Sequence, residues 1–298
     1  MVEFSGVWVP LVTPFRDDRP DLPALQRWVA HLAAQGITGF VACGSTGEAA
    51  MLDEAEQEAV LAATLRAAAG KPVLMGLSGV RPQVVARRAE ALARAHALAG
   101  LLLPPPSYVK PSQAGLQRFF ETVADASPVP IVAYDIPART GVRIAPATLA
   151  ALAAHPRIRA VKDCSADAGA AEAILADGRL ALLGGNDDEM FDQLARGASG
   201  VIAASSQVRT ADFVRMVERL RDSRLPEARR LWRELLPLTR ALFAEPNPVV
   251  IKGVLARQGW MSDECRAPML PAARDSVDRA WALIDRGTDA PPDEISRR

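Results

Sequence analysis

The sequence predicts a (β/α)8 barrel followed by a C-terminal helical extension. Short apolar runs alternate with longer helical stretches roughly every 30 residues, which is typical of βα units. Eight such runs are present, and no GxGxxG turn of an open dinucleotide-binding sheet follows the first of them. Beyond about Arg224 only helical pattern remains. We therefore expect residues 1–224 to form the barrel and residues 225–298 to form a helical region.

The eight apolar runs are the predicted strands. In chain order they are Val7–Leu11, Ile37–Cys43, Pro72–Leu77, Leu101–Leu103, Ile131–Tyr134, Ile158–Lys162, Leu180–Leu183 and Val201–Ala204. Between them, segments such as Asp53–Ala69 and Pro82–Leu98 place apolar residues at helical spacing. The helices expected after the barrel are Pro226–Ala244, Pro248–Gln258 and Ala272–Asp285. The tail from Gly287 is expected to fray.

The composition argues against several kinds of function. The 298-residue chain has a formal net charge of zero and no basic cluster interleaved with aromatic residues, so no nucleic-acid partner is expected. No run reaches the ~18 apolar residues of a membrane span, and the N-terminus lacks a signal-peptide pattern. A cytoplasmic location without membrane contact is therefore expected. Cys43, Cys164 and Cys265 are far apart and form no CxxC, so they are interpreted as small buried apolar residues.

One rare lysine lies where the active site of a barrel would form. The chain has only four lysines, Lys71, Lys110, Lys162 and Lys252. Lys162 ends a predicted strand, and barrel active sites form at the carboxyl ends of strands. An amine can condense with a ketone, whereas a guanidinium cannot, provided that burial and neighbouring charge lower the lysine pKa from ~10.4 towards ~7–8. The alternative is an ordinary lysine that reaches solvent or Asp163.

Polar residues also follow the second predicted strand. Gly44 and Gly47 allow a tight turn whose N–H groups, with the hydroxyls of Ser45 and Thr46, could hold the carboxylate of an α-keto acid. Alternatively, one of these hydroxyls caps the next helix.

The two tyrosines and one arginine complete the candidate site. Tyr108 and Tyr134 both fall in predicted strand-end loops, where a phenol could pass a proton to or from an imine. Packing in the core is the alternative for either. Arg139 could bind a substrate carboxylate through two hydrogen bonds or simply pair with a surface acid.

Neither a metal nor another cofactor is expected. His31, His96 and His155 lie in predicted helical stretches, away from the strand ends, whereas a metal-dependent aldolase or a serine triad would need histidine there. The acidic stretch Asp187–Glu189 is interpreted as the first turn of a helix.

Ordered motifs along the whole chain resemble the dihydrodipicolinate synthase / N-acetylneuraminate lyase family of pyruvate-dependent aldolases. The motifs are Gly44–Glu48, Tyr134–Thr140, Lys162 in Val-Lys-Asp, Gly184–Asp187, Gly200–Ile202 and Glu245–Pro248. The Tyr-x-Ile-Pro-x-Arg-Thr segment is more similar to the synthase branch. This resemblance implies condensation of pyruvate with L-aspartate-4-semialdehyde to 4-hydroxy-tetrahydrodipicolinate, on the route to lysine.

The resemblance also implies roles for the residues that bind pyruvate. Lys162 would form the Schiff base, and Tyr134 would act as the general acid/base above it. Ser45 and Thr46 would hold the carboxylate of the keto acid, together with Gly47 of the same turn. Ser45 stands where many synthases carry Thr, which keeps the hydroxyl.

Three further roles follow from the same resemblance. Tyr108 would complete a proton relay, often across a subunit interface, which implies a homo-oligomer, either a dimer or a tetramer. Arg139 would receive the carboxylate of the semialdehyde. Ile202 would contact the pyruvate pocket through its backbone.

Two departures from the family pattern bear on specificity and regulation. Asp135 replaces a frequent Asn and would add negative charge near a site for anionic substrates. Inhibition by lysine is expected to be weak or absent, because the positions that bind lysine in inhibited relatives are altered. These positions are Ser107, Arg81, Glu54 and Gln57.

Two other functions stay open at this level. The first is a related pyruvate-dependent aldolase or dehydratase that acts on a sugar acid or another hydroxy-keto acid, because loop changes can redirect a pocket without changing the imine chemistry. Arg139 would distinguish it from the synthase. The second is a non-catalytic ligand-binding barrel, against which Lys162 and both tyrosines argue.

Overall fold

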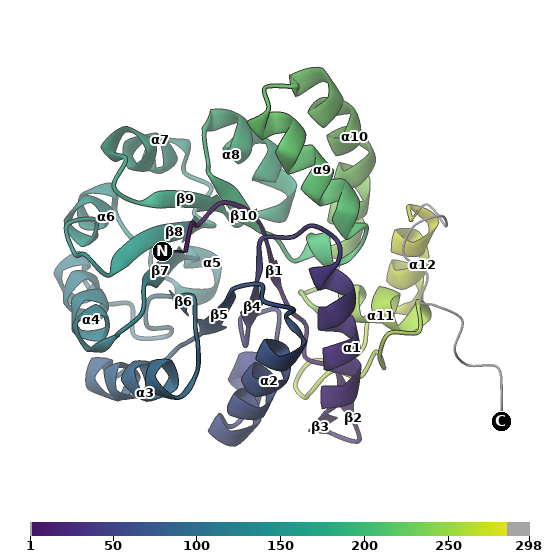
Figure 1. The fold of residues 1–298 in the computed structure, drawn as a ribbon, viewed down its shortest axis with the longest axis horizontal. Helices are drawn as coiled ribbons and strands as arrows, with labels where there is room; N and C mark the ends of the chain where they lie inside the picture. The colour runs from purple at the N-terminus through teal and green to yellow at the C-terminus, as the bar shows by residue number, and fades with distance from the viewer. Residues whose placement is uncertain (1, 285–298) are drawn as a thin grey trace.

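The computed structural model describes residues 2–284, which fold as a closed barrel with helices around it (Figure 1). Within this part of the chain, eight parallel strands close in the order β1-β10-β9-β8-β7-β6-β5-β4. The predicted (β/α)8 barrel is therefore confirmed. The end of the last predicted helix, at Asp285, and the predicted frayed tail from Gly287 lie outside the described residues.

Each barrel strand begins and ends within two residues of its prediction. The strands are β1 Gly6–Pro10, β4 Gly39–Ala42, β5 Val73–Gly76, β6 Gly100–Leu103, β7 Ile131–Asp135, β8 Ile158–Asp163, β9 Ala181–Gly184 and β10 Gly200–Ile202. The agreement is close because parallel strands are buried on both faces and so give nearly continuous apolar runs.

The helices between the strands form the outer layer of the barrel. They are α1 Leu22–Ala33, α2 Glu54–Ala67, α3 Pro82–Ala95, α4 Gln113–Ala126, α6 Pro146–Leu152, α7 Ala168–Asp177, α8 Met190–Arg196 and α9 Thr210–Arg221. Asp53 caps α2 in a capping box with Glu56. The alternative role of Ser45 or Thr46 as the cap of this helix is therefore wrong.

Several short elements were not predicted. They are the hairpin β2 Phe15–Arg16 with β3 Arg19–Pro20, the single-turn helix α5 Pro137–Thr140, and the 3-10 turns η1 Ala49–Met51 and η3 Ser205–Gln207. Such elements are too short to show a hydrophobic period in the sequence. A further 3-10 turn, η2 Asp187–Glu189, is the acidic helical turn that the sequence predicted. Two of the turns, η2 and η3, follow β9 and β10 directly and so lie at the carboxyl end of the barrel.

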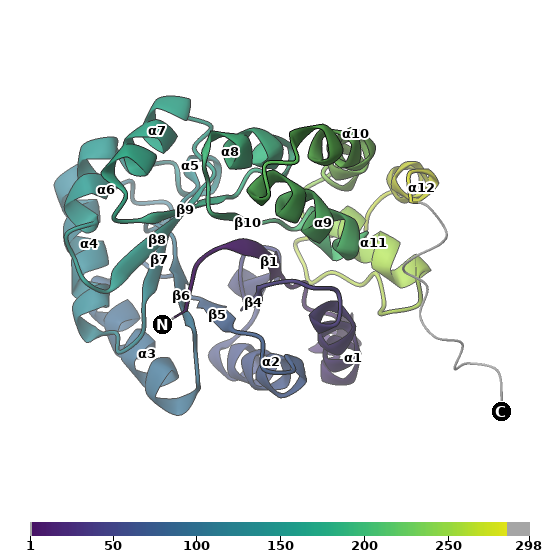
Figure 2. The same cartoon turned by 45° about the horizontal axis from the view of Figure 1, so that its top comes forward.

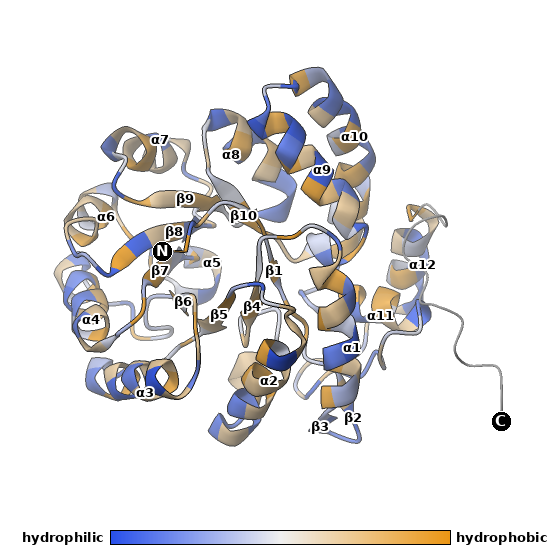
Figure 3. Cartoon of the chain, in the orientation of Figure 1, coloured by the Kyte–Doolittle hydropathy of each residue, from blue (hydrophilic) through white to orange (hydrophobic). Residues whose placement is uncertain are grey.

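The barrel strands consist mostly of apolar residues, coloured orange in Figure 3, and apolar side chains fill the barrel interior. Trp8, Leu183 and Ile202 belong to one buried cluster, and Tyr134 lies at its edge with 6% of its surface exposed. This cluster forms the floor on which the polar strand ends stand.

Three helices follow the barrel, α10 Leu225–Leu242, α11 Val249–Arg257 and α12 Arg274–Ala282. They gather on one side of the barrel, beside α9 and α1 (Figures 1 and 2). The division of the chain into a barrel through Arg224 and a helical region after it stays a prediction. Among residues 2–284 no helix combines the length and the apolar character needed to cross a membrane.

Candidate active site

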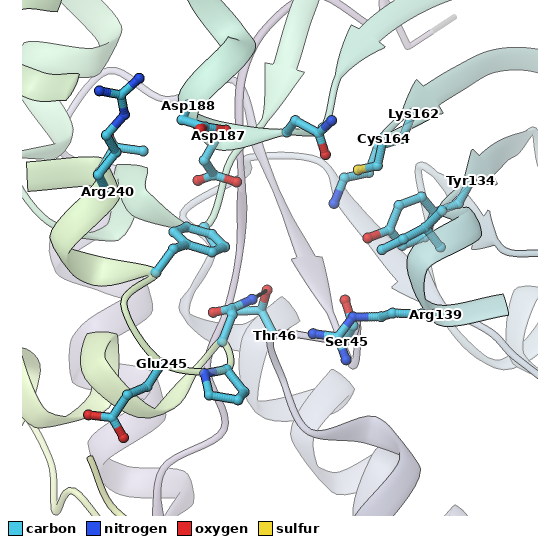
Figure 4. Close-up of a pocket in the computed structure, with 18 of the residues that line it drawn as sticks. Ser45, Thr46, Tyr134, Arg139, Lys162, Cys164, Asp187, Asp188, Arg240 and Glu245 are labelled. Carbon is cyan, nitrogen blue, oxygen red and sulfur yellow. Dashed lines mark hydrogen bonds between the residues drawn. The ribbon is translucent and has the colours of Figure 1, made fainter. Parts of the chain in front are cut away.

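A cavity of about 710 Å³ opens at the carboxyl ends of the strands (Figure 4). Barrel residues and the segment that joins α10 to α11 both line it. The barrel contributes Ser45, Thr46, Tyr134, Ile136, Arg139, Lys162, Cys164, Gly185, Asn186, Asp187, Asp188 and Ala204, and the C-terminal region contributes Thr239, Arg240 and residues 243–247. The site is thus completed by the helical extension.

Lys162 and Tyr134 face each other on neighbouring strands. They are direct register partners between β7 and β8, so both side chains point to the same, inner face of the barrel. Lys162 Nζ lies 4.3 Å from the centroid of the Tyr134 ring and hydrogen-bonds to its phenol. Lys162 is only 6% exposed, so the alternative of a lysine reaching solvent is wrong.

Close packing around Lys162 explains the glycine after β9. A Cβ at Gly185 would come within 2.9 Å of Lys162 Cε. Asp163 does not pair with this lysine; its Oδ1 accepts a hydrogen bond from the Ser165 N–H at 2.8 Å. Within residues 2–284 the Lys162 amine forms no ion pair with a carboxylate, in contrast to Lys252.

Two opposing effects act on the pKa of Lys162. Burial lowers it, and negative charge on Tyr134, Cys164 and Asp187 raises it above the ordinary value when all three are ionised. The expectation that neighbouring charge would lower the pKa is thus wrong. Burial, however, raises the pKa of the Tyr134 phenol and raises that of the Cys164 thiol to about 12. Both are neutral at pH 7, which leaves Asp187 as the anion that opposes the effect of burial.

The buried phenol of Tyr134 is placed to exchange protons. Burial raises its pKa, so it stays protonated at neutral pH, and it hydrogen-bonds with both Lys162 and the side chain of Ser45. A protonated phenol beside an amine can donate to an oxygen that leaves as water. Because Tyr134 borders the cavity, its role is not confined to core packing.

The turn after β4 presents free N–H groups. Its shape is set by the hydrogen bond from the Gly47 N–H to the Gly44 carbonyl, 3.0 Å, and Thr46 Oγ1 accepts from Asn247 Nδ2 at 3.0 Å. Within residues 2–284, no hydrogen bond uses the backbone N–H of Ser45 or Thr46. Two such donors beside a hydroxyl can bind a small carboxylate.

Not every residue predicted for the site lines the cavity. Gly47 packs against the residue that follows β1, where a Cβ would come 3.0 Å from the Leu11 carbonyl, and Ile202 lies fully buried in the barrel core. Tyr108 lies outside the cavity of this chain with 94% of its surface exposed. Arg139 does line the cavity, and no ion pair within residues 2–284 involves it, so it is not a surface arginine paired with an acid.

Asp135 points away from the cavity. It follows Tyr134 in β7 and therefore faces the helices, where its Oδ1 accepts a hydrogen bond from the Ile144 N–H at 3.1 Å. Burial raises the pKa of this carboxyl to about 6. The expected negative charge beside the substrate is therefore wrong, because the carboxylate lies on the other face of the strand.

Sequence reasoning missed three residues of the site. Asp187 belongs to a 3-10 turn before α8, as the acidic turn predicted, but its side chain is buried and accepts hydrogen bonds from the Ser205 N–H and hydroxyl at 2.6 and 2.7 Å. Asn247 reaches the site from the C-terminal region. Cys164 lines the cavity and is half-buried, so its interpretation as a buried apolar residue is wrong. The sequence signals that could have identified Asp187 and Asn247 were the family motifs Gly184–Asp187 and Glu245–Pro248, which contain them.

The donors at the site suit a small carbonyl substrate with a carboxylate. No group of three or more His, Cys, Asp or Glu side chains in residues 2–284 is arranged to hold a metal ion. A buried amine, a protonated phenol and free N–H groups converge on one cavity instead.

Residues 3–286 match the Dihydrodipicolinate synthetase family. The chain belongs to this family. A 4-hydroxy-tetrahydrodipicolinate synthase of Pelobacter propionicus is 36% identical over 271 residues, which cover 90% of this chain and 93% of the relative. One from Stenotrophomonas maltophilia is 37% identical over 278 residues, which cover 91% of this chain and 92% of the relative. The family resemblance of the motifs is confirmed.

Solved structures of the family share the fold. Dihydrodipicolinate synthase from Thermotoga maritima superposes with a TM-score of 0.90 at 30% identity, covering 94% of this chain and 97% of that one. The chloride-inhibited synthase from Acinetobacter baumannii complexed with pyruvate gives a TM-score of 0.90 at 27% identity, covering 94% of this chain and 98% of that one. The protein is thus an enzyme of the synthase type with a barrel of the same architecture.

Proposed function

We propose that this enzyme condenses pyruvate with L-aspartate-4-semialdehyde to 4-hydroxy-tetrahydrodipicolinate through an imine at Lys162. The observation that carries the proposal is a buried lysine amine that lies against Tyr134 in the cavity and has no carboxylate in hydrogen-bonding distance among residues 2–284. Relatives that are 36 and 37% identical carry the name of this activity. No cofactor is needed, because the imine itself activates the keto acid.

The chain offers a partner for each step of imine formation. The carboxylate of pyruvate accepts hydrogen bonds from the backbone N–H groups of Ser45 and Thr46. Lys162 Nζ attacks the keto carbon, and Tyr134 protonates the hydroxyl that leaves as water. Loss of a methyl proton then gives an enamine, whose carbon attacks the aldehyde. The hydrogen bond between Tyr134 and Ser45 supports a route for these protons away from the imine.

The direct test is to trap the imine. The protein is incubated with pyruvate and borohydride and then weighed. We expect a mass gain of one reduced pyruvate, lost in Lys162→Ala. No adduct in the unaltered protein would contradict the imine and favour a binding function.

Arg139 is proposed to bind the carboxylate of the semialdehyde. It lines the cavity and is free of ion pairs within the described residues. Arg139→Ala should raise the KM for the aldehyde at least about tenfold and leave the pyruvate adduct intact. Arg118→Ala removes an exposed arginine of α4 and serves as the control. Unchanged turnover in Arg139→Ala would contradict the synthase assignment.

Polar atoms on the C-terminal side of the cavity favour one alternative substrate. Thr239 Oγ1 and Asn247 Oδ1 are buried and have no partner among residues 2–284. A hydroxylated sugar-acid aldehyde could bond to both, which a pyruvate-dependent aldolase or dehydratase would exploit. Comparing kcat/KM for the semialdehyde with that for small hydroxy-aldehydes decides between the two. A higher value for a hydroxy-aldehyde would favour the alternative.

We further propose a homo-oligomer, a dimer or tetramer, in which Tyr108 approaches the cavity of a partner subunit. Its ring and the neighbouring Val109 are exposed, 94% and 52%, which supports a covered position in an assembly. Light scattering after gel filtration measures the mass. The proposed location is the cytoplasm.

Weak or absent inhibition by lysine is the final part of the proposal. The side-chain amide of Gln57 already has hydrogen-bond partners within the protein and so is not free to bind lysine. Its Oε1 accepts from Arg88 at 2.9 Å, and its Nε2 donates to the Ala49 and Leu52 carbonyls. Glu54 is paired with the same arginine. Half-inhibition at sub-millimolar lysine would contradict this expectation.

A further inference from the structure

We propose that Asp187 binds the α-ammonium group of the second substrate and accepts the proton that this group must lose before its nitrogen closes the ring of the product. The inference rests on the proposed function, since it concerns the amino-aldehyde substrate.

The position of Asp187 is fixed by β10. Its Oδ1 accepts hydrogen bonds from the N–H and the hydroxyl of Ser205, at 2.6 and 2.7 Å, so the carboxylate is held by the turn that follows the next strand. Asp187 is only 7% exposed. Its Oδ2 has no hydrogen-bond partner in the described part of the chain. One oxygen is thus anchored, and the other is available to a ligand.

The Asp187 side chain lines the cavity. Figure 4 shows it on the wall opposite Tyr134 and Arg139, with Lys162 near the floor between them. A substrate with one carboxylate and one ammonium group needs opposite charges on two sides of the pocket. Arg139 supplies the positive charge and Asp187 the negative one.

The charge balance changes during the reaction in a way that suits this role. In the free enzyme, Asp187 and Lys162 interact electrostatically across the cavity. The enamine made from Lys162 is neutral, so the buried carboxylate loses its nearby positive charge when the aldehyde has to bind. An ammonium group of the incoming substrate would bring a positive charge back to Asp187. This is favourable because a buried charge without a partner is costly.

Ring closure then requires a proton acceptor at this position. After carbon–carbon bond formation the Lys162 iminium carbon is electrophilic, but the substrate nitrogen is still an ammonium without a lone pair. Asp187 takes one proton, and the amine attacks the iminium carbon. The ring nitrogen passes its two remaining protons to Lys162 Nζ as the bond from that carbon to Nζ breaks, so Lys162 leaves as an ammonium and the ring keeps a neutral C=N bond. Asp187 finally returns its proton to water.

The acidity of Asp187 fits an acceptor that works near neutral pH. Burial raises its pKa to about 6, against the hydrogen bonds from Ser205. Such a carboxylate is ionised at pH 7 and yet is a stronger base than an exposed aspartate.

The test compares aldehydes with and without the amino group. Asp187→Asn keeps the size and the acceptor for Ser205 but removes the charge. With L-aspartate-4-semialdehyde we expect kcat/KM to fall about 100-fold or more. With succinic semialdehyde, which lacks the amino group, borohydride trapping should yield the aldol adduct on Lys162 as in the unaltered enzyme. Pyruvate alone should also be trapped normally.

Two further variants make the result specific. Asp192→Asn removes an exposed charge from the nearby helix α8 and should leave every readout unchanged. Ser205→Ala keeps the carboxylate and loosens its anchor, so a loss of only several-fold is expected.

Three outcomes would overturn the inference. Turnover of the amino-aldehyde within twofold of normal in Asp187→Asn would show that the carboxylate is not needed. An equal loss of both aldehyde reactions would show that Asp187 only shapes the pocket. A normal aldol adduct but no ring product in the unaltered enzyme would contradict the ring closure itself. Failure of the unaltered enzyme to trap pyruvate would instead contradict the proposed function.

Discussion

Two lysines are buried in this protein, one at the end of a barrel strand and one in the C-terminal region. Lys162 is 6% exposed and Lys252 is fully buried. Each ammonium lies over an aromatic ring, 4.3 Å from the centroid of Tyr134 and 4.4 Å from that of Phe15. Burial and aromatic contact therefore do not distinguish a reactive lysine from a structural one.

The difference lies in the partner of each amine. Lys252 Nζ donates to Glu48 Oε1 at 2.7 Å, and this carboxylate is as buried as the lysine, so the proton is held in a permanent ion pair. The hydrogen-bonding neighbour of Lys162 is a phenol that stays neutral at pH 7. An amine without a fixed counter-charge can lose its proton and act as a nucleophile.

The ion pair between Lys252 and Glu48 also helps to hold the active site in place. Glu48 ends the turn that carries Ser45 and Thr46, and its Oε2 accepts from the Arg266 N–H at 3.0 Å. Lys252 and Arg266 both belong to the C-terminal region. The carboxylate-binding turn of the barrel is therefore held from behind by the helical extension.

The largest effect should come from removing the reactive amine. Lys162→Arg keeps a positive charge but cannot form an imine, so turnover should fall by at least about 10³-fold and the pyruvate adduct should vanish from the mass spectrum. Folded Lys252→Met is the matched comparison and should still give the adduct. An adduct in Lys162→Arg would mean that the reactive amine has been misassigned.

Breaking the structural pair should chiefly affect stability. Lys252→Met leaves the buried Glu48 carboxylate without a counter-charge, which should cost about 3–5 kcal/mol and lower Tm by roughly 10 °C. The double variant Lys252→Met/Glu48→Gln should recover part of the loss, since no unpaired charge is left. Equal Tm values for the single variant and the unaltered protein in calorimetry would show that the pair contributes little.

Removing the Tyr134 hydroxyl tests whether the neutral phenol beside Lys162 takes part in the reaction. Tyr134→Phe keeps the ring over Lys162 but loses the proton donor, and kcat/KM should fall by roughly 10²–10³-fold with little change in Tm. Trapping of pyruvate should become slower and yet remain complete at long times. If the rate of trapping is unchanged, Tyr134 serves only to pack against the amine.

The smallest effect is expected on the outer face of the same strand. The pKa of Asp135 is raised to about 6, so ionisation disfavours the folded state, and the protein loses stability as pH rises from about 4 through 6. Asp135→Asn avoids this loss, so above pH 7 it should raise the free energy of unfolding by at most about 3 kcal/mol, at 1.36 kcal/mol per pKa unit, and raise Tm accordingly. The gain should shrink towards pH 4. A gain that is constant with pH would point to packing instead.

Much of this protein was predictable from its sequence. Buried parallel strands give continuous apolar runs, so the strands were located within two residues, and the residues just after them identified Lys162, Tyr134, Ser45 and Arg139 as candidates. The reason is that a barrel gathers the carboxyl ends of all its strands on one face.

Only the tertiary structure decided which side chains meet there and what charge each one carries. Thr46 meets Asn247 across 201 residues, and Glu48 meets Lys252 across 204. Asp187 reaches Ser205 because β9 and β10 are neighbours in the closed sheet. The sequence alone marked both lysines as rare, but barrel closure and the docking of α11 gave a carboxylate to one and a neutral phenol to the other, because a pKa depends on neighbours in space.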